Sequence, residues 1–138
     1  MTQILLSAVA GVLAWFATSF FGAPFKQFLE LRQRIATERL RALNTPINLL
    51  TKLGYEKTEE MQKDIDRLEE VKDRLRDAAI SMQAFGQSMP VTRVLRWFGF
   101  DPALIADRAN AYANDLDGPI LRRAQHDREL RSALKIKG

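Results

Sequence analysis

The acidic stretch Asn114-Asp115-Leu116-Asp117-Gly118 comes nearest of any segment to a metal-binding motif, because its composition is that of part of a calcium-binding loop. In such a loop glycine holds the sixth position, and acidic ligands hold the first and the twelfth. With Gly118 in sixth place, those two positions fall on Ala113 and Ala124, which have no side-chain oxygen. We therefore expect no calcium site.

The other residues that could do chemistry are scattered. Asp64 and Asp66 would point to different faces of a helix, and their neighbours are basic. His126 is the single histidine and stands in a polar stretch, which indicates a solvated surface position. The chain has no cysteine and no glycine-rich phosphate loop or nucleophile elbow. We predict that the protein is not an enzyme and has no catalytic residue, cofactor, metal site or small-molecule substrate.

The element that must position everything else is the opening stretch, Thr2 to Phe21, which contains no charged residue and no proline. A bilayer core about 30 Å thick needs roughly 20 helical residues to cross. Residues 1–23 are therefore predicted to form a transmembrane helix. Two alternatives are a cleaved signal peptide and a core helix of a soluble protein. A signal peptide would have a basic N-terminal region and a small-residue cleavage site, and this stretch has neither. A core helix of a soluble protein usually has a polar face, which this stretch also lacks.

Charge on the two sides of this helix predicts its orientation. Only the α-amino group precedes it, whereas five basic residues follow it before position 44: Lys26, Arg32, Arg34, Arg39 and Arg41. By the positive-inside rule, we expect the N-terminus outside a bacterial inner membrane and the remainder in the cytoplasm.

Small residues recur along one face of the predicted span at Ser7, Gly11, Thr18 and Gly22. Such residues let two membrane helices approach closely, so these four are candidate helix–helix contacts. The alternative is that small residues are simply common in membrane helices.

Residues 24–44 are predicted to form a basic amphipathic helix after the Gly22-Ala23-Pro24 break, where Pro24 either opens a new helix or kinks a continuing one. Its first turns would lie on the anionic membrane surface, where the expected contacts are Phe25, Lys26, Phe28, Arg32 and Arg34. The alternative is a core helix whose charged face is solvated, and this interpretation is favoured beyond Arg34.

The string FFGAPFKQFLELRQRI in this region resembles a juxtamembrane block of small bacterial single-pass membrane proteins of unknown function. The likeness covers about the first 40 residues, with a vaguer match around 95–116. It implies an integral membrane protein of helical character. It assigns no catalytic or binding residue to this chain.

Residues 45–138 are predicted to form a helical bundle domain, so the fold class is all-α: one span followed by a small cytoplasmic bundle. Helices are expected over 47–53, 58–85, 90–98, 102–116 and 119–134, with Thr58 and Asp101 as N-caps. The long helix has a heptad-like seam interrupted by Lys72. A coiled coil between chains and a bundle within one chain both fit, and the wide apolar stripe favours the bundle.

Two segments could contact partners. Trp97-Phe98-Gly99-Phe100 is predicted to anchor a short connection in the core, and the alternatives are a docking surface and membrane contact. The last helix is expected to turn Ile120, Leu121 and Leu130 inward and its arginines outward. That basic face would be solvated, or would contact membrane or protein. Nucleic acid is the least favoured partner, because no nucleic-acid-binding signature accompanies it.

Together these observations predict a membrane-anchored, non-enzymatic interaction or accessory protein. Its partners would be the bilayer and either a second protein or another copy of itself. The alternative is a phage-type membrane-perturbing protein, namely a holin, a spanin or a small toxin.

Overall fold

One uninterrupted helix forms the first third of the chain, running from α1 (Thr2–Ala17) through the π-helical turn η1 (Thr18–Gly22) into α2 (Ala23–Asn44). This computed structural model describes residues 2–45 and 58–136. Four further helices follow: α4 (Glu59–Ser88), α5 (Thr92–Trp97), α6 (Pro102–Asn114) and α7 (Ile120–Leu134). The described residues contain no strand, and the predicted all-α class is confirmed.

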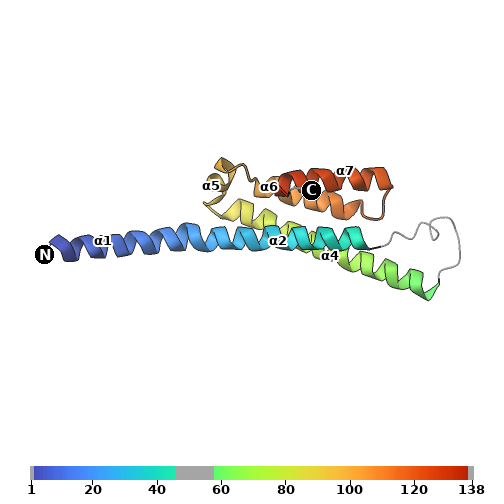
Figure 1. Cartoon of the computed structure of the whole chain (residues 1–138), viewed down its shortest axis with the longest axis horizontal. Helices are drawn as coiled ribbons and strands as arrows, with labels where there is room; N and C mark the ends of the chain where they lie inside the picture. Colours follow the sequence, from blue (N-terminus) through green and yellow to red (C-terminus); the bar gives the residue numbers. More distant parts are fainter. Residues whose placement is uncertain (1, 46–57, 137–138) are drawn as a thin grey trace.

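The two halves of the long helix have different surroundings (Figure 1). Helix α1 projects away from the rest of the molecule and has no buried residue. Helix α2 packs against α4 and α7, α4 packs against α6, and α6 packs against α7. The short helix α5 lies at the end of this bundle nearest α1.

The π turn explains how the helix passes Pro24 without ending. Proline has no N–H, and in an α-helix its ring collides with the carbonyl four residues earlier, here that of Phe20. In η1 the Ala23 N–H donates to the Thr18 carbonyl, one residue further back than in an α-helix. This wider turn relieves the conflict, so the Gly22-Ala23-Pro24 segment continues the helix.

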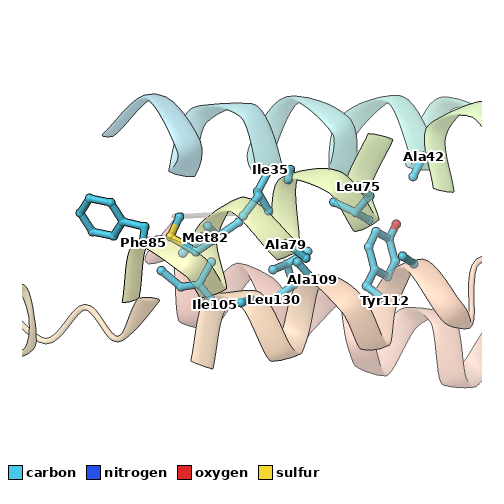
Figure 2. Close-up of a cluster of buried hydrophobic side chains, with 14 of the residues drawn as sticks. Ile35, Ala42, Leu75, Ala79, Met82, Phe85, Ile105, Ala109, Tyr112 and Leu130 are labelled. Atoms are coloured by element: carbon cyan, nitrogen blue, oxygen red, sulfur yellow. The ribbon is translucent and has the colours of Figure 1, made fainter. Parts of the chain in front are cut away.

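The core is built from regularly spaced apolar residues on each helix (Figure 2). In α2 these are Phe28, Ile35 and Ala42, seven residues apart, and α4 contributes Leu75, Ala78, Ala79, Met82 and Phe85. Ile105, Ala109 and Tyr112 from α6 and Leu130 and Leu134 from α7 complete it. The alanines at the α4–α6 contact let the two helices approach closely. Among the described residues, the long helix therefore pairs within its own chain, as the wide apolar stripe predicted.

Both predicted N-caps are confirmed. The Thr58 hydroxyl accepts a hydrogen bond from the Met61 N–H at 3.2 Å, and the Asp101 carboxylate accepts one from the Ala103 N–H at 3.1 Å. Each cap pairs an N–H that the first turn of a helix leaves without an intrahelical partner.

The predicted end of the long helix at residue 85 is wrong, because α4 continues through Gly86-Gln87-Ser88 and ends before Met89-Pro90. Met89 is extended, as the residue before a proline prefers to be. Gly86 serves packing instead. A Cβ built on it would lie 3.2 Å from the Pro102 Cβ, so its missing side chain makes room for the start of α6.

The aromatic segment after α5 divides between core and surface. Gly99 has a φ of +78°, a conformation that favours glycine, and there the chain reverses. Phe100 then packs against Phe28, with ring centroids 5.4 Å apart. Trp97 and Phe98 are 91% and 65% exposed. Core anchoring is therefore confirmed for Phe100 and wrong for the two residues before Gly99.

The helix predicted over 47–53 lies outside the described residues.

Candidate functional site

The first feature with a functional implication is the apolar helix Thr2–Phe21. The helix that contains it, Thr2–Asn44, is long enough and apolar enough to cross a membrane, and its apolar window has no buried residue. In water, large side chains such as Leu6, Val12 and Trp15 would all be exposed. Because a soluble monomer rarely exposes an apolar surface this extensive, the segment requires a covering environment.

The small-residue face of this helix has no contact with the bundle. A Cβ on Gly11 would meet open space, and one on Gly22 would touch only Thr18 of the same helix. The hydroxyls of Ser7 and Thr18 donate to the carbonyls of Ile4 and Ala14, at 2.9 and 2.8 Å. Their hydrogen-bonding needs are thus met within the helix, as hydrocarbon requires. The helix–helix contact stays a prediction.

The five residues predicted to touch the membrane surface lie in different environments. Phe25, Lys26 and Arg34 are exposed. Phe28 is fully buried against Phe85 and Phe100, so its side chain faces the core.

Arg32, the fifth of these residues, faces α7. Its Nε donates to the Leu134 carbonyl at 2.8 Å, and its guanidinium lies over the Phe100 ring. Beyond Arg34, α2 is a core helix, as predicted, and membrane contact stays a prediction for the exposed residues.

A buried polar layer joins α2 to α7, and the sequence analysis missed it. Arg39 and Asp127 are both buried and form a two-point ion pair, Nε–Oδ1 at 2.6 Å and Nη2–Oδ2 at 3.0 Å. Arg123 is also buried and donates to the Ala42 carbonyl at the end of α2. Tyr112 lies beside this layer, and burial raises the pKa of its hydroxyl, partly offset by nearby Arg123.

This layer corrects the predicted face of α7. Ile120 and Leu121 are 57% and 86% exposed, whereas Arg123 and Asp127 face inward together with Leu130. The spacing 123, 127, 130, 134 is helical, so it does mark one face. Two of its four members are charged, however, and apolar periodicity alone cannot find such a face.

A groove opens beside the polar layer, between the end of α2 and α7. Its volume is about 480 Å³, and its lining mixes apolar and cationic groups: Leu43, Thr45, Ile120, Arg123, Ala124, Asp127, Arg128 and Arg131. Leu43, Ala124 and Arg128 are exposed at this groove. It lies at the end of the bundle far from α1, because α7 begins beside the end of α2.

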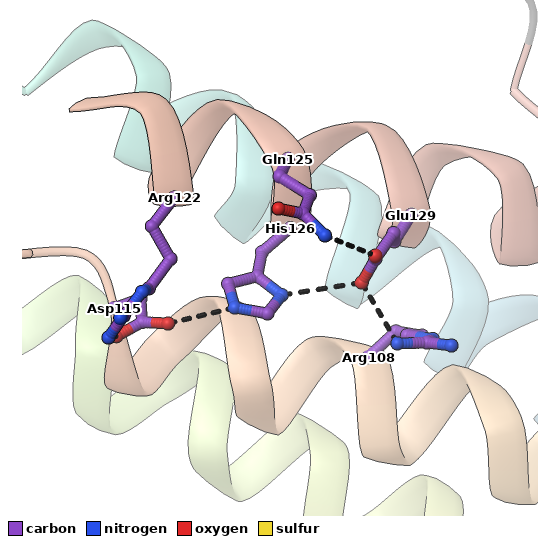
Figure 3. A network of polar contacts seen from close by, with 6 residues as sticks. All are labelled: Arg108, Asp115, Arg122, Gln125, His126 and Glu129. Carbon is purple, nitrogen blue, oxygen red and sulfur yellow. Dashed lines mark hydrogen bonds and ion pairs between the residues drawn. The ribbon is translucent and has the colours of Figure 1, made fainter. Parts of the chain in front are cut away.

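A second polar network connects α6 to α7 on the surface (Figure 3). His126 lies between two carboxylates, with Nε2 at 2.8 Å from Asp115 and Nδ1 at 3.3 Å from Glu129. His126 is thus partly buried and partnered, unlike the solvated residue that was predicted. A hydrogen bond from Gln125 holds the pKa of Glu129 below its ordinary value, and the charge of Arg108 adds to this effect.

Both polar clusters connect one helix to another. In the α6–α7 network Arg108 pairs with Glu129, and Arg122 and His126 both contact Asp115. A cavity lined by Leu104 and Ala133 as well as by Arg108 and Glu129 adjoins it. Within residues 2–45 and 58–136, no three histidine or acidic side chains are grouped so as to hold a metal ion. This arrangement can hold the helices together.

No protein-family model matches this chain, and the searches of curated proteins and of solved structures found no match. The resemblance to small bacterial single-pass membrane proteins stays a prediction. What is shown is coarser: an N-terminal helix that could span a membrane and a helical remainder.

Proposed function

We propose that this protein is a membrane-anchored, non-enzymatic accessory protein that presents a rigid helical bundle to a protein partner or to a second copy of itself. The continuity of the helix Thr2–Asn44 carries this proposal. Its first half exposes only uncharged residues, and its second half is part of the bundle core. Because the helix has no break between its two halves, no flexible linker separates the bundle from the proposed anchor.

The contact surface is proposed to lie at the groove far from α1. Apolar side chains of Leu43 and Ile120 are exposed there beside Arg128, and Arg123 and Asp127 give the floor a fixed shape. Interfaces commonly combine such apolar contacts with arginine. The Arg39–Asp127 pair fixes α7 to α2, so the groove keeps its form.

Orientation follows the charge bias, with the N-terminus outside an inner membrane and the bundle in the cytoplasm. The absence of native cysteine allows a direct test with single-cysteine variants. Thr2→Cys and Ser132→Cys replace two exposed residues at opposite ends of the chain. With a membrane-impermeant maleimide on intact spheroplasts, Thr2→Cys should be labelled, and Ser132→Cys should be labelled only after permeabilisation.

The reverse labelling pattern would contradict the orientation and favour a spanin, whose long helix lies outside. Both variants in the soluble fraction would overturn the anchor. A loss of membrane potential on induced expression would favour a holin or a toxin over an accessory protein.

The proposed contact surface has its own test. A photo-crosslinking residue at Ala124 should give a defined adduct in membranes, either with one partner or with a second copy. The matched control is Asp77, an exposed position on the outer face of α4. Equal crosslinking at both positions, or none at either, would contradict a contact at the groove.

A further inference from the structure

The turn that follows α5 holds two large aromatic side chains in solvent. Trp97 is 91% exposed and Phe98 is 65% exposed, although the neighbouring residues Leu95 and Phe100 are packed inward. Burying a large aromatic side chain contributes about 1.5–3 kcal/mol, and neither of these two gains that from the bundle.

The turn is fixed by contacts on both sides. The Lys135 ammonium donates to the Phe98 carbonyl at 2.9 Å and lies 4.9 Å from the centre of the Phe100 ring. Gly99 takes its left-handed conformation directly beside this ammonium, where a Cβ would collide with it. The exposed aromatics are therefore presented by a structured turn anchored to α2 and α7.

The turn also lies at a particular height along the long helix. Phe100 packs on Phe28, which is six residues beyond Gly22 and so about 9 Å further along the axis. The headgroup layer of one leaflet extends roughly 5–8 Å beyond the hydrocarbon core. With the span ending near Gly22, the contact between Phe28 and Phe100 lies at the outer edge of that layer. Figure 1 shows α5 beside the first turns of α2, at the end of the bundle nearest α1.

The charges around the turn fit the same environment. Arg93 and Arg96 on α5 and Lys26 on α2 are exposed. Arg96 pairs with Asp101 at 3.6 Å, and Lys26 pairs with Glu30 at 3.8 Å. An indole at headgroup depth with cations beside it is the arrangement that membrane interfaces favour, especially where lipids are anionic.

We infer that Trp97 and Phe98 insert into the headgroup region of an anionic membrane, making a second attachment beside the span. This inference rests on the proposed anchor, since α1 supplies the height at which the turn sits. The second attachment fixes the tilt of the bundle, which a single helix crossing a bilayer does not.

Two tryptophans in the chain allow the anchor and the second attachment to be tested separately. Trp15→Phe leaves Trp97 as the only indole, and Trp97→Phe leaves Trp15. Each full-length variant is reconstituted in vesicles of phosphatidylethanolamine and phosphatidylglycerol that carry bromine either high or low on the acyl chains. We expect Trp15 to be quenched by both lipids, and Trp97 to be quenched mainly by the lipid with bromine near the headgroup.

The two failures differ. Quenching of Trp15 without quenching of Trp97 would overturn the second attachment and leave the anchor in place. No quenching of Trp15 would overturn the anchor and this inference together.

The role of the cations is tested in the Trp15→Phe background. Replacing Arg93 and Arg96 with glutamine should lower Trp97 quenching at least twofold in anionic vesicles. The matched control replaces Lys63 and Arg67, exposed on the far part of α4, and should change nothing. If Trp97 quenching falls equally in both double variants, or in neither, Arg93 and Arg96 do not contribute specifically to the membrane contact.

Discussion

The two halves of the N-terminal helix share a backbone conformation and differ in everything around it. Residues Thr2–Gly22 carry no charged side chain and none of them is buried, whereas Ala23–Asn44 buries both apolar and charged side chains. The first half is suited to lipid by composition alone. The second half depends on particular partners in α4 and α7, so replacing one of its buried residues, even by a chemically similar one, should disturb the packing.

The largest effect should come from breaking the buried ion pair of the second half. Arg39→Leu leaves the Asp127 carboxylate buried without its partner, which typically costs about 3–5 kcal/mol. Urea unfolding of the detergent-solubilised chain, followed by circular dichroism, measures this loss. Arg34→Leu, an exposed arginine on the same helix, should change the unfolding free energy by less than about 0.5 kcal/mol.

A variant with both partners replaced, Arg39→Met with Asp127→Leu, should recover most of the lost stability, because no buried charge remains. If the double variant is no more stable than Arg39→Leu, the packing of the layer matters more than its charge.

In the first half of the N-terminal helix, a charged substitution should weaken membrane association without changing the stability of the bundle. Gly11→Arg meets open space, so the bundle should unfold as in the wild type. At the centre of a membrane helix an arginine costs about 2.5–3.5 kcal/mol, and the fraction recovered with membranes should fall. Gly11→Leu is the control and should stay in the membrane. Destabilisation of the bundle by Gly11→Arg would show that the two halves are not independent.

A smaller, pH-dependent effect should come from Tyr112. Burial raises the pKa of its hydroxyl above the ordinary value of 10.0, so the unfolded chain loses this proton at a lower pH than the folded one. Stability from this group is complete below pH 10 and falls as the pH rises beyond it, by up to about 1.4 kcal/mol per pH unit. In Tyr112→Phe, urea unfolding should show a shallower alkaline decline. An unchanged decline would contradict a buried, protonated hydroxyl.

Local patterns made much of this fold predictable from sequence. The N-caps at Thr58 and Asp101 depend on neighbouring residues only, and the apolar stripe of α4 reflects helical spacing. The predicted helix end just before Gly86 was wrong for the opposite reason. A glycine that makes room for Pro102 has the same appearance in sequence as a glycine that ends a helix.

The residues of the candidate surfaces could not be predicted from local patterns. Arg39, Arg123 and Asp127 have the composition of a solvated face, and only the pairing of α2 with α7 shows that they are buried. Trp97 and Phe98 have the composition of a core, and only the reversal at Gly99 shows that they are exposed. Pairing between distant segments decides burial in both cases, and a single sequence does not contain it.

Because the helix is continuous through η1, the rotation of its first half about the helix axis also fixes the rotation of the bundle. Each residue of an α-helix advances about 1.5 Å and turns about 100°. Adding one residue between Gly22 and Ala23 would lift the bundle only slightly, yet swing its groove about a quarter of a circle in the membrane plane. If the proposed anchor is correct, the helical register at Thr18–Gly22 determines which side of the bundle faces a given neighbour.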